Sequence, residues 1–171
     1  MPTTYEPIAT TTATSFVSSF SFTNISQAYT DLVLVCQSKL GTTTTTQDSN
    51  IRVNGLSTTI YSDTRIYAGG SGNGIGYDNN TSDTWSRTGI TCFPGWGIET
   101  KVFMNYTNTS INKTILSYSG AGLTSDANTY VGLWTSVART TNAITQIDML
   151  SGQSKGWASG TTVTLYGILK A

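Results

Sequence analysis

The sequence predicts an all-β fold: an antiparallel β-sandwich, jelly-roll-like, of about ten strands with an extended N-terminal arm. Serine and threonine make up about three residues in ten, and this composition favours strands and turns over helices. No window shows a sustained apolar period of 3.6 residues with helix caps. Short apolar stretches instead recur between turn signals, as in sandwiches and barrels.

Two stretches are expected to form the centre of the core. In residues 29–38, Leu32, Leu34 and Cys36 fall on one face of a strand, while Val33 and Val35 fall on the other. A strand that is apolar on both faces is typical of the middle of a packed β-structure. Residues 161–169 have the same character and are expected in the same core, and central first and last strands would make the sandwich jelly-roll-like.

The N-terminal 14 residues are polar and are predicted to form an extended arm, with a short edge strand around Ile8. A frayed terminus is the alternative. Residues 15–171 are predicted to form a single sandwich domain, since 171 residues suffice for one core. Its strands are expected, in order, over 14–22, 29–38, 51–53, 58–61, 64–67, 85–92, 98–106, 113–118, 129–134, 143–150 and 161–169.

Local patterns support several of these elements. Asn54-Gly55 predicts a tight turn, because both residue types tolerate positive φ. Clean alternation over 98–106 predicts a half-buried strand. Residues 69–80 are rich in glycine and are predicted to form a long exposed loop. They neither open a helix nor precede Gly-Lys-Ser/Thr, so they do not match a phosphate-binding motif.

The charge distribution argues against nucleic acid and membrane as partners. Nine basic and nine acidic residues give a net charge of zero, and the basic residues are scattered, whereas phosphate binding requires clusters. No apolar run reaches membrane-spanning length, and the N-terminus lacks a signal region. The chain is therefore expected to fold in a cytoplasm, with Cys36 and Cys92 as small buried hydrophobes in preference to a disulfide.

No catalytic, metal or cofactor site is predicted, and the protein is expected not to be an enzyme. The chain has no histidine, which removes the commonest general base and metal ligand. No pair of acids is singled out for glycoside hydrolysis, and Asp78 and Asp83 lack the regular spacing of a calcium loop. Asn/Asp turn chemistry explains these residues better.

Aromatic residues beside glycines leave a carbohydrate-binding option open. The candidate exposed interaction residues are Trp96, Trp157 and Tyr77, because exposed aromatic faces stack on sugars. Packing of the loops against the sheets is the alternative explanation for the tryptophans.

Several phrases together resemble a group of small virion proteins of tailed phages, especially phages of cyanobacteria and marine bacteria. The phrases are 5–12 (YEPIATTT), 28–35 (AYTDLVLV), 52–55 (RVNG), 105–109 (NYTNT), 131–134 (VGLW), 143–147 (AITQI) and 164–168 (TLYGI). Their order and spacing agree over almost the whole chain, and residues 68–97 depart most from the group.

The resemblance implies a β-sandwich that assembles with itself, as a trimer, and docks on the major capsid protein as a capsid cement or decoration protein. The expected localisation is the capsid surface of the virion, after synthesis in the host cytoplasm. The candidate docking arm carries Tyr5, Pro7 and Ile8 and would add a strand to an exposed sheet edge. The alternative function is a receptor-binding or fibre module that recognises host-surface glycans.

Overall fold

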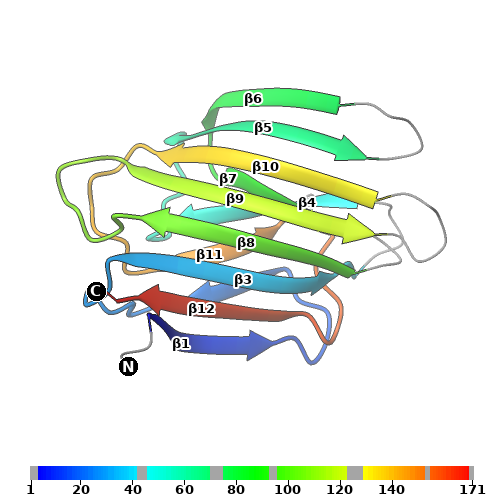
Figure 1. The fold of residues 1–171 in the computed structure, drawn as a ribbon, viewed down its shortest axis with the longest axis horizontal. Helices are drawn as coiled ribbons and strands as arrows, with labels where there is room; N and C mark the ends of the chain where they lie inside the picture. The colour runs from blue at the N-terminus through cyan, green and yellow to red at the C-terminus, as the bar shows by residue number, and fades with distance from the viewer. Residues whose placement is uncertain are drawn as a thin grey trace.

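The computed structural model describes residues 4–41, 46–69, 75–92, 96–122, 129–152 and 155–169, and for 46–47, 75–78 and 90–92 it describes the backbone alone. These residues form twelve strands in two antiparallel sheets that pack face to face (Figure 1), which confirms the all-β sandwich. The strands are β1 (Tyr5–Thr12), β2 (Ser19–Phe22), β3 (Asp31–Lys39), β4 (Thr46–Val53), β5 (Tyr61–Gly69), β6 (Ile75–Asp83), β7 (Ser86–Cys92), β8 (Trp96–Met104), β9 (Lys113–Gly122), β10 (Thr129–Ala138), β11 (Ile147–Ser151) and β12 (Thr162–Ile168).

The large sheet has eight strands in the order β1-β12-β3-β8-β9-β10-β5-β6, and the small sheet has four in the order β2-β11-β4-β7. β3 and β12 are neighbours, with Leu34 opposite Leu165 and Cys36 opposite Val163. This pairing confirms that the two apolar stretches near the ends of the chain share one core. The eight-plus-four arrangement does not confirm the jelly-roll detail, which stays a prediction.

The apolar core lies between β3 and β12 of the large sheet and β2, β4 and β11 of the small one. Leu32, Leu34 and Cys36 are fully buried on the inner side of β3. They face a second apolar layer that includes Ile51 and Met149. Full burial of each large side chain contributes roughly 1.5–3 kcal/mol. Cys36 is a free, buried cysteine, as predicted, whereas the side chain of Cys92 lies outside the described residues.

The Asn54-Gly55 turn is confirmed, and it also connects two parts of the fold. Both residues have positive φ, 53° and 66°. The side-chain oxygen of Asn54 accepts hydrogen bonds from the backbone amides of Thr145 (2.8 Å) and Gln146 (3.1 Å). The turn after β4 therefore holds the chain just before β11, the neighbouring strand of the same sheet.

The edge strand expected around Ile8 is present and covers Tyr5–Thr12, which pairs with β12. Three other local predictions need correction. The long loop expected over 69–80 is wrong for residues 75–80, which belong to β6 and pair with β5; residues 70–74 lie outside the description. The two pieces 58–61 and 64–67 are replaced by one strand, β5, whose irregularity at Asp63 leaves the pairing with β10 intact. The strand expected over 14–22 is shorter, covering Ser19–Phe22.

Candidate protein–protein interface

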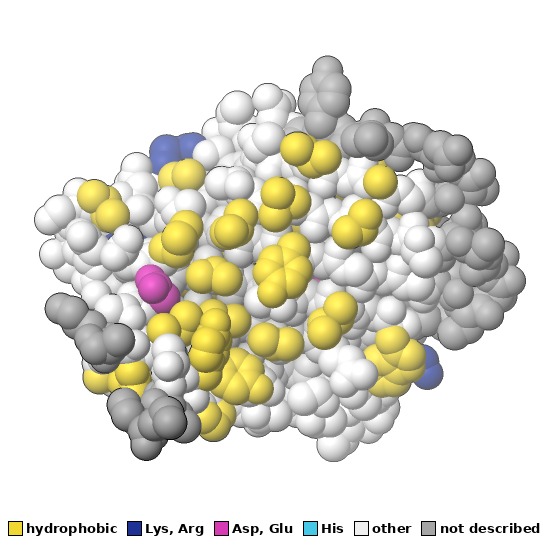
Figure 2. All heavy atoms as spheres, viewed as in Figure 1, with side chains coloured by type: hydrophobic (Ala, Val, Ile, Leu, Met, Phe, Trp, Pro, Cys, Tyr) yellow, Lys and Arg dark blue, Asp and Glu magenta, His cyan; other side chains and the backbone are white. Residues whose placement is uncertain are grey.

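The outer side of the large sheet carries most of the exposed large hydrophobic side chains in the described chain. Seven of the ten lie on β5, β8, β9 and β10, and we call these seven the apolar face: Ile66, Trp96, Ile98, Met104, Tyr118, Val131 and Leu133. Their exposure ranges from 39% to 61%. Figure 2 shows hydrophobic side chains spread over this side of the molecule, with charged ones at its margins.

Strand register brings these residues together from distant parts of the chain. Leu133 of β10 lies opposite Tyr118 of β9 on one side and Ile66 of β5 on the other. Residues that are directly opposite in an antiparallel pair have Cβ atoms roughly 5 Å apart on one face. A continuous apolar row therefore crosses three strands, and Val131 extends it along β10 by one position of the same face.

The apolar face is hollowed in two places. Gly120 lies between Ile98 of β8 and Val131 of β10, and a Cβ added at Gly120 or at Gly122 would meet no heavy atom within 4 Å. This glycine hollow has a volume of about 690 Å³ and is also lined by Val35 and Trp96. A second hollow of about 350 Å³ lies around Ile66, Tyr118 and Leu133.

Charge is nearly absent from the outer side of the sheet. By register and alternation, its described strand positions hold two charged residues, Asp31 and Lys39, at opposite ends of β3. Asp31 accepts a hydrogen bond from the amide of Asn105 at 2.8 Å, and the Lys39 ammonium lies 5.9 Å from the Trp96 ring centroid. Long-range charge attraction therefore contributes little to what this surface binds.

The inner side of the same four strands is unusually polar. The buried residues there include Asp63, Glu99, Lys101, Ser117, Ser119 and Ser136. They face β7 and β4 of the small sheet, and β7 packs against both β9 and β10. An antiparallel sheet with one solvated face ordinarily buries its apolar side and exposes its polar side. In this half of the molecule the inner side combines these polar residues with the buried Tyr61, Phe103, Ile115 and Trp134, while the outer side exposes hydrophobic residues.

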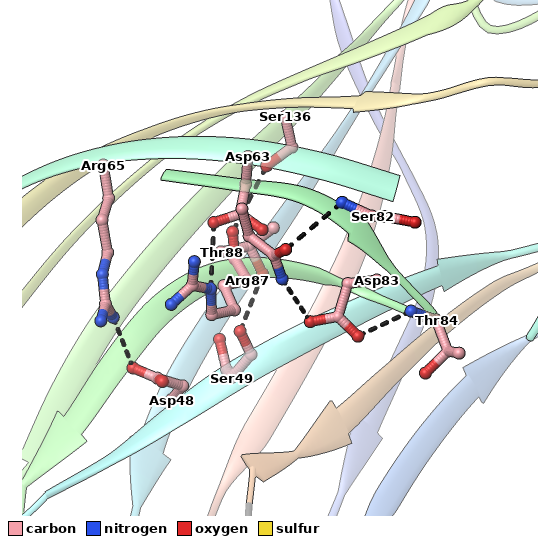
Figure 3. Close-up of polar contacts among 11 residues, drawn as sticks. Asp48, Ser49, Asp63, Arg65, Ser82, Asp83, Thr84, Arg87, Thr88 and Ser136 are labelled. Atoms are coloured by element: carbon pink, nitrogen blue, oxygen red, sulfur yellow. Dashed lines mark hydrogen bonds and ion pairs between the residues drawn. The ribbon is translucent and has the colours of Figure 1, made fainter. Parts of the chain in front are cut away.

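Ion pairs and hydroxyl hydrogen bonds satisfy much of the polar interior. Lys101 Nζ lies 2.5 Å from Glu99 Oε2, both side chains are fully buried, and the Ser49 hydroxyl donates to the same carboxylate. Figure 3 shows the neighbouring pairs, in which Arg87 Nε lies 3.0 Å from Asp63 Oδ1 and Arg65 reaches Asp48 at 3.1 Å. The Ser49–Glu99, Arg87–Asp63 and Arg65–Asp48 contacts join the two sheets, whereas Glu99 and Lys101 both belong to β8.

Burial raises the pKa of the Asp63 carboxyl above its ordinary value, although the guanidinium of Arg87 opposes the shift. Asp63 Oδ2 is buried and has no hydrogen-bond partner. A perturbed acid can mark a functional site, but structural ion pairs produce the same effect. The geometry of Asp63 matches the structural case, because its partner Arg87 comes from the facing sheet.

The three aromatic residues that the sequence predicted to be exposed differ in their burial and in whether their side chains are described. Trp96 is exposed, as predicted, and belongs to the apolar face. The prediction for Trp157 is wrong: its side chain is fully buried, because the residue bridges Val17 and Leu40 and its ring packs on Phe20 at 5.3 Å between centroids. Tyr77 belongs to β6, and its side chain lies outside the described residues.

The three candidate docking residues all belong to the edge strand β1. Tyr5 is 56% exposed and its ring makes an edge-to-face contact with Tyr166, with centroids 6.5 Å apart. Pro7 is exposed and adjoins a shift in register. Ile8 is partly buried against the core. β1 pairs on one side with β12 and ends the sheet on the other.

Sequence reasoning missed one polar pocket, on the outer side of the small sheet. Asn50, Arg52 and Trp85 line it together with Ser19 and Leu150, and its volume is about 360 Å³. The Arg52 guanidinium lies 5.4 Å from the Trp85 ring centroid. Asn50 is 5% exposed, and its side-chain oxygen has no hydrogen-bond partner. Alternation in β4 would have placed Asn50 and Arg52 on one face, but nothing local connects them with Trp85.

No metal or membrane-spanning element is identified in the described residues. Within them, no group of three or more His, Cys, Asp or Glu side chains lies close enough to hold a metal ion. In the same residues, no helix is long and apolar enough to cross a membrane.

Comparison with known proteins adds no relative. No family model matches the chain, and no curated protein or solved structure is significantly similar to it.

Proposed function

We propose that this protein is a non-enzymatic structural component of a virion, a capsid cement or decoration protein of a tailed phage. It would self-assemble and dock on the major capsid protein, after synthesis in the host cytoplasm. The observation that carries the proposal is the apolar face, whose seven large hydrophobic side chains are 39% to 61% exposed on the outer side of the sheet (Figure 2).

Physical reasoning connects this face with assembly. Contiguous exposed apolar patches of more than a few hundred Å² are rare on monomeric proteins and mark protein–protein contacts. Removing the charges of buried ion pairs such as Glu99–Lys101 from water costs free energy. Burial of the apolar face on assembly would offset this cost. Such a sheet then has the burial of a central layer, with contacts on both sides.

The edge strand β1 supports a second contact, with the shell itself. Its free edge presents backbone donors and acceptors of the kind that strand addition uses. Tyr5, Pro7 and Ile8, the candidate docking residues, lie on this strand. A cement protein needs one contact with its own copies and one with the capsid, and the two surfaces lie on different parts of the sheet.

Cryo-EM of particles from the phage that encodes this chain tests the proposal. We expect many symmetry-related copies on the outer shell, with the apolar face buried and β1 against the capsid protein. Density confined to the tail or fibre ends, or particles without this chain, would overturn the cement function.

The second candidate function is recognition of host-surface glycans. It is favoured by the small-sheet pocket, where Trp85 offers a stacking surface and Asn50 an acceptor without a partner. Binding to a glycan array that is lost in Trp85→Ala would support this pocket, and loss in Trp96→Ala would place the sugar on the apolar face. Absence of binding across host polysaccharides, with both variants folded, would count against this function.

A further inference from the structure

We infer that the occupant of the apolar face is a second copy of this chain. The inference rests on the proposed function as an assembly protein and names the partner of one of its surfaces. Three properties of the face lead to it: its area, its lack of charge and its shape.

The area is suitable for a stable contact. Seven side chains are on average about half exposed. Taking roughly 150–200 Å² for a large apolar side chain, they present about 500–700 Å² of apolar surface. The partly exposed Val35, Val102 and Leu116 of the same side add to this. A standard stable interface buries about 800 Å² on each partner, so one further protein surface of similar size would cover the face.

The charge distribution favours an identical partner. A contact between different proteins commonly obtains its specificity and its association rate from complementary charges. Here the two charged residues on the outer strand positions, Asp31 and Lys39, lie at opposite ends of β3 and leave the apolar face uncharged. Two copies can therefore approach without like-charge repulsion, and their uncharged faces match in polarity.

The shape also allows the face to pack on a copy of itself. Ile98 (59% exposed) and Val131 (61% exposed) project on either side of the glycine hollow. Packed sheets lie about 10 Å apart and their side chains interdigitate. The projecting side chains of one copy can therefore enter the hollows of the other copy. Gly120 keeps one of these hollows open, because it has no side chain.

Sedimentation velocity of the purified full chain tests the inference, from about 1 to 200 µM. We expect a mass that is a multiple of 18.2 kDa, and either a dimer or a trimer supports a second copy at the face. Val131→Arg should raise the dissociation constant about 100-fold, since a charge is placed in the middle of an apolar contact. Gly120→Arg should do the same by filling the hollow, and neither residue packs in the core.

Ile111→Arg is the matched control. Ile111 is a comparably exposed hydrophobic residue, at 48%, but it lies in the turn between β8 and β9 and not on the sheet. We expect this variant to assemble like the unchanged protein. A monomer throughout the concentration range would overturn the inference. Equal assembly of the unchanged protein and all variants would also overturn it, provided that circular dichroism shows the variants to be folded.

This test and the test of the proposed function can fail separately. If the chain assembles in solution but is absent from the phage particles, the virion function is refuted and the second-copy inference is not. A chain that coats the shell but is monomeric in solution, with its apolar face on the capsid protein, would refute the second-copy inference alone.

Discussion

The buried pair of Glu99 and Lys101 allows a sharp test of how charges are accommodated in the interior of the large sheet. Its atoms lie 2.5 Å apart and both side chains are fully buried. At an effective dielectric constant of about 20, such a pair attracts by roughly 7 kcal/mol, and the cost of removing two charges from water offsets this attraction. The intact pair therefore adds little net stability, whereas loss of one partner leaves a buried carboxylate without its counter-ion.

We expect Lys101→Met to lower the free energy of unfolding by about 3–5 kcal/mol. The double variant Glu99→Leu/Lys101→Met should be within about 2 kcal/mol of the unchanged protein, because it removes both charges, although the Ser49 hydroxyl loses its acceptor. Urea unfolding at matched protein concentration measures both values. The midpoint for Lys101→Met should fall by roughly 2 M.

Lys39→Met is the control for this experiment. Lys39 is partly exposed and its described partner is the ring of Trp96, so its loss should cost less than about 1 kcal/mol. The reasoning is refuted if Lys101→Met is no more destabilising than Lys39→Met. It is also refuted if the double variant is as unstable as the single one, because the cost would then not come from an unpaired charge.

Three further predictions concern the interior. Burial raises the pKa of the Cys36 thiol, so in a Cys92→Ser background Ellman's reagent should label Cys36 only after unfolding, and rapid labelling of native protein would contradict this. Because the folded-state pKa of Asp63 is raised from 3.8, its contribution to stability is largest below about pH 4 and decreases as the pH rises through the folded-state pKa; Asp63→Asn should remove this part of the pH dependence in urea titrations, and an unchanged pH profile would argue against it. A Cβ at Gly132 would lie 2.3 Å from the ring of Trp134, so Gly132→Ala should destabilise by about 1–3 kcal/mol, and a thermal midpoint equal to that of the unchanged protein would show that the ring can move.

Much of the fold was predictable from local patterns. Alternation and apolar runs located most of the strands, and the character of 29–38 and 161–169 identified the pair that forms the middle of the core. The prediction for 69–80 failed at its second half, because the polar residues of β6 have low strand propensity and pair only through the neighbouring β5.

The candidate interface was less predictable. The alternation over 98–106 separates Ile98 from Glu99 and predicts a half-buried strand, and the apolar half is ordinarily the buried one. In the structure the half with Glu99 and Lys101 lies inside, and Ile98 lies outside at 59% exposure. Likewise, the glycines beside Trp157 suggested an exposed loop, while its bridges to Val17 and Leu40 bury it.

The sequence by itself determined the all-β class, the position of most strands and the Asn54-Gly55 turn, because strand periodicity and turn conformation depend on residues close in the chain. Only the tertiary structure decided which side of each strand faces the interior. That choice depends on what packs opposite, and here Ser49 and Arg87 of the small sheet supply polar partners for Glu99 and Asp63. With those partners inside, Ile98 and Ile66 of the same strands lie on the outer surface, where another protein can bury them.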